Sequence, residues 1–361
     1  MRFPNPFPGK PSRLSISGLF LIDPTVLTKL DGLPFRSILE ERLGAALFKR
    51  LDRANKEQAG SPQLVDALLN AIPDNGSPFF ATLRAAHAGD AEAVAAVEAV
   101  GVWESFCAGF EGPLDYRQRY RVAIERACRE PTEALRRGEL DVAVGRLLAE
   151  PVTSPLLWRQ AIEALDGKTS IEHLGPFQFA VAMEVELSCL AALDAQRLVD
   201  DGNENSTLSM LLPDEGSALN PAATFFRLIM RGVGIASLSE MERELQRIGC
   251  PVHLGTLKNW NRGLRLPSAS SLKLIAKLKP DLARGDALWM LYWATKVLML
   301  LGYYGTQCAA RASAEPRPEI RARFRPWPEF PHEHADFGGW CRARYPTWLA
   351  YHRARIKTTF P

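Results

Sequence analysis

Apolar residues recur at intervals of three and four along most of this chain, and that spacing is the strongest constraint on its fold. The pattern marks one face of a helix. It runs through residues 35–51, 91–106, 114–128, 139–148, 155–165 and 177–198. Sustained alternation of polar and β-branched residues is absent, so any sheet is minor. The sequence therefore predicts an all-α protein.

Proline and glycine pairs separate these stretches, and two longer segments indicate domain boundaries. Breaks are expected at 61–62, 77–78, 112–113, 130–131 and 150–151. Residues 200–217 are acidic and rich in turn formers, whereas residues 311–331 alternate prolines with arginines and aromatics. We therefore predict a multi-helical N-terminal domain (1–205), a central module with a following apolar helix (216–305) and a C-terminal extension (306–361), in which a short helix covers residues 339–357.

Positive charge is confined to particular segments. Between residues 237 and 285 there are nine Lys and Arg against four Asp and Glu, and from residue 311 onward there are ten against five. The net charge of the whole chain is only +3, so the first 236 residues sum to −7. Such segregation favours a surface that faces a polyanion.

Cysteine usage and the N-terminus indicate the compartment. The six cysteines, at positions 107, 128, 189, 250, 308 and 341, form no CxxC pair, which excludes a zinc ribbon and disfavours a disulfide framework. Buried thiols are expected instead. The proline-rich start and the short apolar patch at 18–22 do not fit a signal peptide, so we expect a cytoplasmic protein.

The segment most informative about function is 237–278. Ser237 or Ser239 can cap a helix, and Glu242 stands three residues beyond Ser239, as in a capping box. A second helix over 252–260 and a third capped by Ser268 follow after tight turns. The residues expected to pack inward are Met241, Leu245, Ile248, Val252, Leu257, Trp260, Leu272, Ile275, Ala276 and Leu278. Three short helices with tight turns form a helix-turn-helix core.

This segment also resembles the lambda-repressor-like (XRE/Cro) helix-turn-helix family, over about residues 237–280. The matching residues are Thr256-Leu-Lys-Asn-Trp260, Arg262-Gly263, Pro267-Ser268, Leu272, Ile275-Ala276 and Leu278. In that family the helix that ends in the Trp is the recognition helix, and the Pro-Ser step opens the next helix. The resemblance implies binding to double-stranded DNA.

Candidate DNA contacts follow from where a recognition helix meets the major groove. Its N-terminal residues face base edges. The base-contact candidates are His253, Gly255, Thr256 and Lys258. Cations on the flanking elements suit phosphate contacts, which position a protein without selecting sequence. The phosphate-contact candidates are Arg243, Arg247, Arg262, Arg265 and Lys273, and Lys258 could serve there as well.

Residues 287–304 are almost continuously apolar, with Lys296 near the centre. A central Lys costs about 3 kcal/mol on insertion scales. Since the stretch is also only marginal in length for a membrane span, we expect a buried helix or a dimer helix rather than a span.

Other constellations have plainer interpretations. Gly232-Val-Gly234 is expected to be a helix end rather than a dinucleotide fingerprint, since no third glycine follows. The His332-Glu-His334-Ala-Asp336 run lacks a distant partner, so no metal site is expected. Tyr116-Arg-Gln-Arg-Tyr-Arg121 is expected to form an amphipathic helix with its arginines outward. Glu184 and Glu186 are two residues apart and so do not face each other on a helix, and a solvated face is expected for them.

We therefore expect a DNA-binding protein, most plausibly a transcriptional regulator that acts as a homodimer or larger assembly, with the N-terminal domain serving oligomerisation or a protein partner. Residues 287–304, directly after the module, are the candidate dimer helix. The alternative is a protein–protein adaptor in a nucleoprotein or defence assembly that keeps the helix-turn-helix only as a fold. No catalytic motif and no cofactor-binding motif occur in the sequence, so we do not expect an enzyme.

Overall fold

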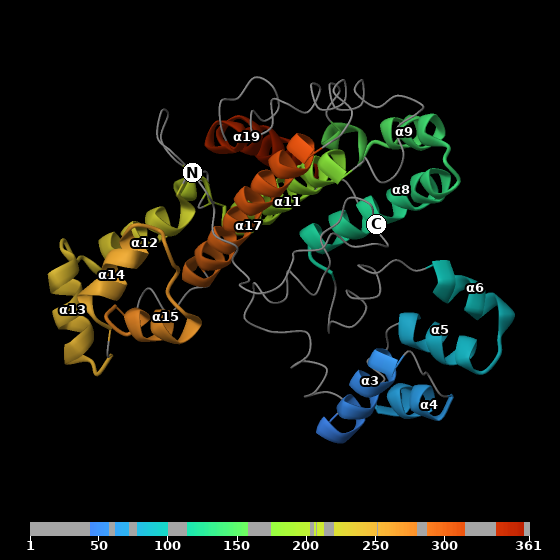
Figure 1. Ribbon diagram of the computed structural model, residues 1–361, viewed down its shortest axis with the longest axis horizontal. Coiled ribbons are helices and arrows are strands. Elements are labelled where there is room, and N and C mark those ends of the chain that lie inside the picture. The colour runs from blue at the N-terminus through green and yellow to red at the C-terminus, as the bar shows by residue number, and fades with distance from the viewer. Residues whose placement is uncertain are drawn as a thin grey trace.

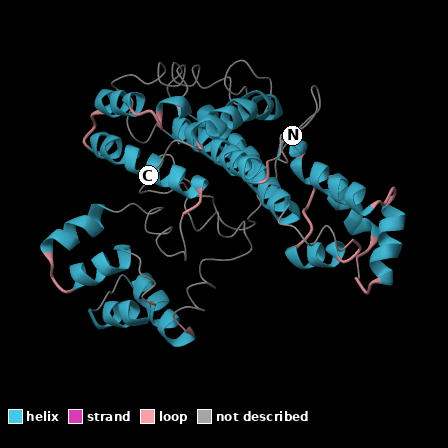
Figure 2. Ribbon diagram, turned by 180° about the vertical axis from the view of Figure 1, so that it is seen from behind, coloured by secondary structure: helices cyan, strands magenta, loops and turns pink. Residues whose placement is uncertain are grey.

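The computed structural model describes residues 44–57, 62–71, 78–99, 114–157, 175–202, 206, 208–212, 220–250, 252–279, 287–314 and 337–356. Every regular element within these ranges is helical, as Figure 2 shows. The all-α prediction is therefore confirmed for the described part of the chain.

The helices fall into three groups along the chain (Figure 1). The first group holds α3 (Ala45–Glu57), α4 (Pro62–Ala71), α5 (Pro78–His87) and α6 (Ala91–Ala99). The second holds α8 (Tyr116–Arg136), α9 (Leu140–Ala149), the 3-10 turn η1 (Ser154–Leu156) and α11 (Gly175–Asp200). After the turn η3 (Leu208–Leu211) come α12 (Pro221–Val233), α13 (Leu238–Arg247), α14 (Leu254–Asn261), α15 (Ala269–Ala276), α17 (Ala287–Ala314) and α19 (Phe337–Arg355).

The first group is joined by contacts between neighbouring helices. His87 of α5 pairs with Asp66 of α4 at 2.7 Å, and Arg84 donates to the carbonyl of Leu69 at 3.4 Å. Asp90 accepts the backbone N–H of Ala93 at 2.9 Å, so it caps α6 as its position before the helix predicts.

Helix α11 lies at the centre of the main core. Residues 181–192 are all buried, because α8, α17 and α19 pack against this helix from different sides. Figure 1 shows α17 running beside α11. A helix that is covered all round must place any polar side chain against a partner on a neighbouring helix, since water cannot reach it.

The C-terminal part of the chain belongs to this core, which differs from the predicted extension. A helix was expected over 339–357, and α19 matches it closely. Its Trp340 and Trp348 are buried against α11, so these aromatics serve as core packing. One continuous hydrophobic core runs from α8 to α19, and it includes residues from both sides of the predicted boundaries near 205 and 305. The prolines at 316–331 and the His332–Asp336 run lie outside the described residues.

Helix α8 continues through a proline that the sequence analysis took as a break. Pro131 lies inside α8 and is buried. Because proline has no N–H, the carbonyl four residues earlier, on Ala127, loses its usual helical partner. The next residue offsets part of this loss, since the Thr132 hydroxyl donates to the Cys128 carbonyl at 2.6 Å. The rest of the helix is fixed by packing against α9 and α11.

The helices predicted at 237–278 are present as α13, α14 and α15. Ser237 caps α13 by accepting the N–H of Glu240, and the Glu240 carboxylate accepts the N–H of Ala236. The cap is therefore Ser237 and not Ser239. Ser268 caps α15 through the N–H of Ser271, as expected.

The predicted inward face of the module is largely buried. Fully or nearly buried are Met241, Leu245, Val252, Leu257, Trp260, Leu272, Ile275 and Ala276, while Ile248 and Leu278 are half-buried. A preceding helix completes this core, because Phe226 of α12 meets the Trp260 ring edge-on with centroids 5.6 Å apart.

Asn220 links the start of α12 to the end of α14. Its side-chain oxygen accepts the N–H of Ala223, and its amide nitrogen donates to the Arg262 carbonyl at 2.9 Å. Gly263, the next residue, has φ +69° and lies directly against this side chain, so a Cβ there would overlap it. Gly234 has φ +76° and ends α12, which confirms that Gly232-Val-Gly234 is a helix terminus.

Helix α17 joins the module to the main core. Most of the apolar side chains between Leu288 and Leu301 are buried against α11 and α12, so the buried-helix interpretation of this stretch is confirmed, and these side chains form no exposed dimer stripe. The Tyr292 hydroxyl donates to the Pro267 carbonyl at 2.8 Å. Among the described residues no single helix is long and apolar enough to cross a membrane, while α12 and α13, bent by 64°, pass that test only when taken together.

Replacing Gly263 with alanine should destabilise the protein. An L-residue in the left-handed region costs about 1–2 kcal/mol, and the overlap with Asn220 adds to that cost. Gly255 provides a matched control, because it lies inside α14 with open space around it. Gly255→Ala should be neutral or stabilising by up to about 1 kcal/mol. Urea unfolding of both variants tests this, and equal effects at the two positions would contradict it.

Candidate functional site

The predicted recognition helix presents most of its candidate contact residues on one exposed side. Gly255 and Lys258 are exposed, as is Arg262 just after the helix, and spacings of three and four place these residues on one face. Thr256 is exposed at the edge of this face, and His253 is exposed at the N-cap position. The opposite side of α14 is occupied by buried Leu257 and Trp260, which fixes the rotation of the helix.

The remaining predicted contact residues lie on other elements. Arg243 and Arg247 are exposed one turn apart on α13, and Arg265 is exposed in the turn after α14. Lys273 is exposed on α15. The structure therefore gathers the α14 residues and Arg262 on one face, and it presents Arg243, Arg247, Arg265 and Lys273 from three neighbouring segments.

Carboxylates near this surface are already engaged within the module. Glu240 accepts the N–H of Ala236, and Glu244 pairs with Arg247 at 3.0 Å. Glu242, assigned from sequence to a capping box, instead accepts the N–H of Leu254 at 2.7 Å. That bond caps α14, whose own N-cap residue makes no side-chain cap.

As a result, several cations are not neutralised by the protein itself. Arg247 has a carboxylate partner. Within the described part of the chain, no ion pair is formed by Arg243, Lys258, Arg262, Arg265 or Lys273. The electrostatic field of these five side chains is therefore directed into solvent, with an apolar side chain, Leu264, exposed to 57% among them. Sequence reasoning did not single out Leu264.

A second polar cluster, inside the main core, corrects the expectation for Glu184 and Glu186. Both carboxylates are fully buried rather than solvated. Glu186 is paired with Arg121 of α8, whose Nη1 lies 2.6 Å from its Oε1. Arg121 is only 2% exposed, so this arginine points inward and not outward as expected from the Tyr116–Arg121 pattern.

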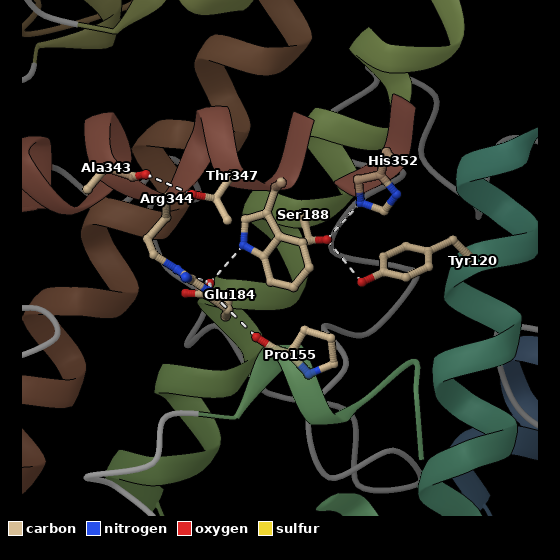
Figure 3. Close-up of polar contacts among 9 residues, drawn as sticks. Tyr120, Pro155, Glu184, Ser188, Ala343, Arg344, Thr347 and His352 are labelled. Carbon is tan, nitrogen blue, oxygen red and sulfur yellow. Dashed lines mark hydrogen bonds and ion pairs between the residues drawn. The ribbon is translucent and has the colours of Figure 1, made fainter. Parts of the chain in front are cut away.

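Glu184 is paired with a different helix. It accepts from Arg344 Nε at 2.5 Å and from Trp348 Nε1 at 2.7 Å, and both donors belong to α19 (Figure 3). Residues two apart on a helix point about 200° apart. That geometry explains why Glu184 reaches α19 while Glu186 reaches α8.

Ser188 and His352 form the middle of this buried cluster. The Ser188 hydroxyl lies 2.9 Å from His352 Nε2 and 3.0 Å from the Tyr120 hydroxyl, as Figure 3 shows. His352 Nδ1 lies 3.0 Å from the Tyr116 hydroxyl. Burial lowers the pKa of His352 to about 3 and raises the pKa of the Tyr120 phenol well above its usual value.

The Ser–His pair was considered as a catalytic centre, since a serine activated by histidine is a common nucleophile. Ser188 and His352 are each 0% exposed, so no substrate reaches the hydroxyl in this conformation. The ring nitrogens of His352 are both occupied by hydroxyl partners. The pair therefore acts as a structural connection between α8, α11 and α19.

The described cysteines and acidic residues show no further reactive site. Cys128, Cys189, Cys250 and Cys341 are free and buried, which confirms the buried-thiol prediction for these four. Burial raises the pKa of Cys128 and of Cys189 to about 12, so neither thiol is activated. The described residues contain no group of three His, Cys, Asp or Glu arranged to hold a metal ion.

Comparisons with known proteins add no relative to this description. No protein-family model, no curated protein and no solved structure matches the chain significantly.

The buried Arg121–Glu186 pair yields a prediction about stability. Glu186→Gln leaves the Arg121 guanidinium buried without its counter-charge, and such a loss costs about 3–5 kcal/mol. Replacing both partners by apolar residues of similar size, in Arg121→Met/Glu186→Leu, removes the buried charge altogether and should cost much less. Denaturant unfolding of the two variants measures this. A double variant at least as unstable as Glu186→Gln would refute it.

His352 yields a prediction about pH. An unfolded histidine binds a proton below about pH 6.5, whereas folded His352 stays neutral down to about pH 3. The unfolded state therefore binds more protons in this window, and stability falls as the pH is lowered through it.

Between pH 6.5 and 4.5 this effect should reach about 2 kcal/mol beyond that of His352→Gln, whose side chain does not titrate. Thermal or urea unfolding at a series of pH values is the measurement. Parallel pH profiles for the wild type and the variant would rule out this role for His352.

Proposed function

We propose that this protein binds duplex DNA through the α13–α14 helix-turn-helix, as a transcriptional regulator. The observation that carries the proposal is the set of five cations around α14 that have no ion-pair partner among the described residues, while the nearby carboxylates are engaged in capping and pairing. A surface of this kind supplies the phosphate contacts that dominate DNA affinity.

The face of α14 is suited to the major groove. Gly255 has no side chain and open space around it, so DNA can approach the backbone closely. Thr256 can contact a base edge or a thymine methyl, and Lys258 can donate to guanine acceptors. The buried Leu257 and Trp260 hold these residues outward.

The Glu242 cap has a consequence for how phosphate is bound. In many DNA-binding proteins the N–H groups at a helix start accept a phosphate oxygen. Here the Leu254 N–H is occupied by Glu242. Phosphate contacts are therefore assigned to side chains, with Arg262 and Arg265 after α14 and Arg243 before it.

The proposal includes two recognition helices in a homodimer or larger assembly, which would meet half-sites one DNA turn apart. The apolar side chains of α17 are used inside the chain, so we assign the dimer contact to another surface. The N-terminal helices are the candidate for that contact or for a protein partner.

Duplex-DNA binding measured by fluorescence anisotropy across a salt series tests the proposal. With five phosphate contacts, affinity should fall about 500-fold between 50 and 200 mM salt. Lys258→Ala/Arg262→Ala should bind more weakly at every salt concentration, and the slope of log K against log salt should become shallower by about 1 to 2.

A charge-matched control separates this site from general basicity. Arg129 of α8 and Arg353 of α19 are exposed cations outside the module, and Arg129→Ala/Arg353→Ala removes the same charge. Equal losses in the two double variants would refute the α14 interface. Absence of binding by the wild type at low salt would refute DNA binding and favour the adaptor alternative, in which an apolar interface is insensitive to salt.

A further inference from the structure

We infer that a pocket between α8, α19 and the segment after α9 binds a small organic anion. The pocket has a volume of about 580 Å³, within the range typical of small-molecule sites. It lies in the main core region, away from the helix-turn-helix, so the inference does not rest on DNA binding.

One stripe of α8 forms the floor of the pocket. Arg119, Val122, Ala123, Arg126 and Ala127 all line it, and their spacing of three and four places them on one helix face. The stripe alternates guanidinium groups with apolar side chains. A ligand on it would meet charge and hydrophobic surface within one turn.

The charge lining the pocket is predominantly positive. Arg119 and Arg126 come from α8 and Arg355 comes from α19, whereas Glu150 is the carboxylate among the lining residues. Arginine donates through a planar fork that matches phosphate and carboxylate oxygens. Three such groups around one concave surface favour an anionic head group.

An aromatic wall completes the site and indicates the rest of the ligand. Arg355 lies over the Tyr351 ring at 3.8 Å from its centroid, and the Tyr351 hydroxyl lies 3.5 Å from the Pro151 carbonyl. Leu114, Val122 and Val152 provide apolar contacts nearby. The surface therefore fits an anion attached to an aromatic or other apolar body.

The buried cluster below the pocket holds its walls in register. His352 follows Tyr351 on α19 and is fixed between Ser188 and Tyr116. Tyr351 and Arg355, one turn apart on α19, are thereby held opposite the arginines of α8. A site whose side chains are fixed beforehand loses less entropy on binding.

Phenyl phosphate is a suitable probe, because it joins a phosphate to an aromatic ring. Isothermal titration calorimetry with the full chain and no DNA should give saturable binding. Inorganic phosphate carries only the head group and benzyl alcohol only the apolar body, so each should bind at least about tenfold more weakly. Absence of saturable binding, or equal binding by benzyl alcohol, would overturn the inference.

Three variants locate the site. Arg126→Gln removes one exposed guanidinium from the pocket and should weaken phenyl phosphate about tenfold. Ala127→Phe keeps every charge but fills the pocket and should abolish binding. Arg129→Gln, on the same helix but outside the lining, should bind as the wild type does. Equal weakening by Arg126→Gln and Arg129→Gln, or full binding by a folded Ala127→Phe, would overturn the assignment.

Discussion

The burial of two carboxylates on α11 is the interaction on which the main core depends. Glu184 and Glu186 are both inaccessible to water, and each is neutralised by an arginine from a different helix. Losing one partner of such a pair is costly, because the remaining charge stays in a medium of low dielectric constant. The two pairs therefore allow one arrangement of α8, α11 and α19 and penalise a slip of either outer helix by a turn. The Ser188–His352 contacts add a directional constraint at the same level of α11.

The module at the other end of the core is held together by different means. Its helices are short, and each end is satisfied by a local or neighbouring side chain, such as Ser237 for α13, Glu242 for α14 and Ser268 for α15. Hydrogen-bonded caps compensate for the small amount of apolar surface that helices of eight to ten residues can bury. Since the acidic side chains are used in this way, the fold itself leaves a cationic surface around α14.

Local signals in the sequence predicted the helices well and the buried pairs poorly. Periodicity and capping residues are local, so α9, α13, α15 and the Asp90 cap of α6 could be predicted from neighbours within four residues. The partners of Glu184 and Arg121 lie 160 and 65 residues away, and no spacing rule relates such positions. Pro131 shows the opposite failure, because tertiary packing overrides a local signal to end the helix. Of the candidate interface, the outward face of α14 followed from Leu257 and Trp260, whereas the Glu242 cap required the turn geometry.

The long separation between Glu184 and Arg344 has a consequence for how the protein is made. Translation proceeds at about 5–20 residues per second, so α11 is synthesised roughly 8 to 30 seconds before the arginine that neutralises it, given the 160-residue separation. During that interval the emerging chain holds a carboxylate on an otherwise apolar helix with no counter-charge. Completion of the core therefore waits for α19 to leave the ribosome, and the α11 surface remains open to chaperones until then.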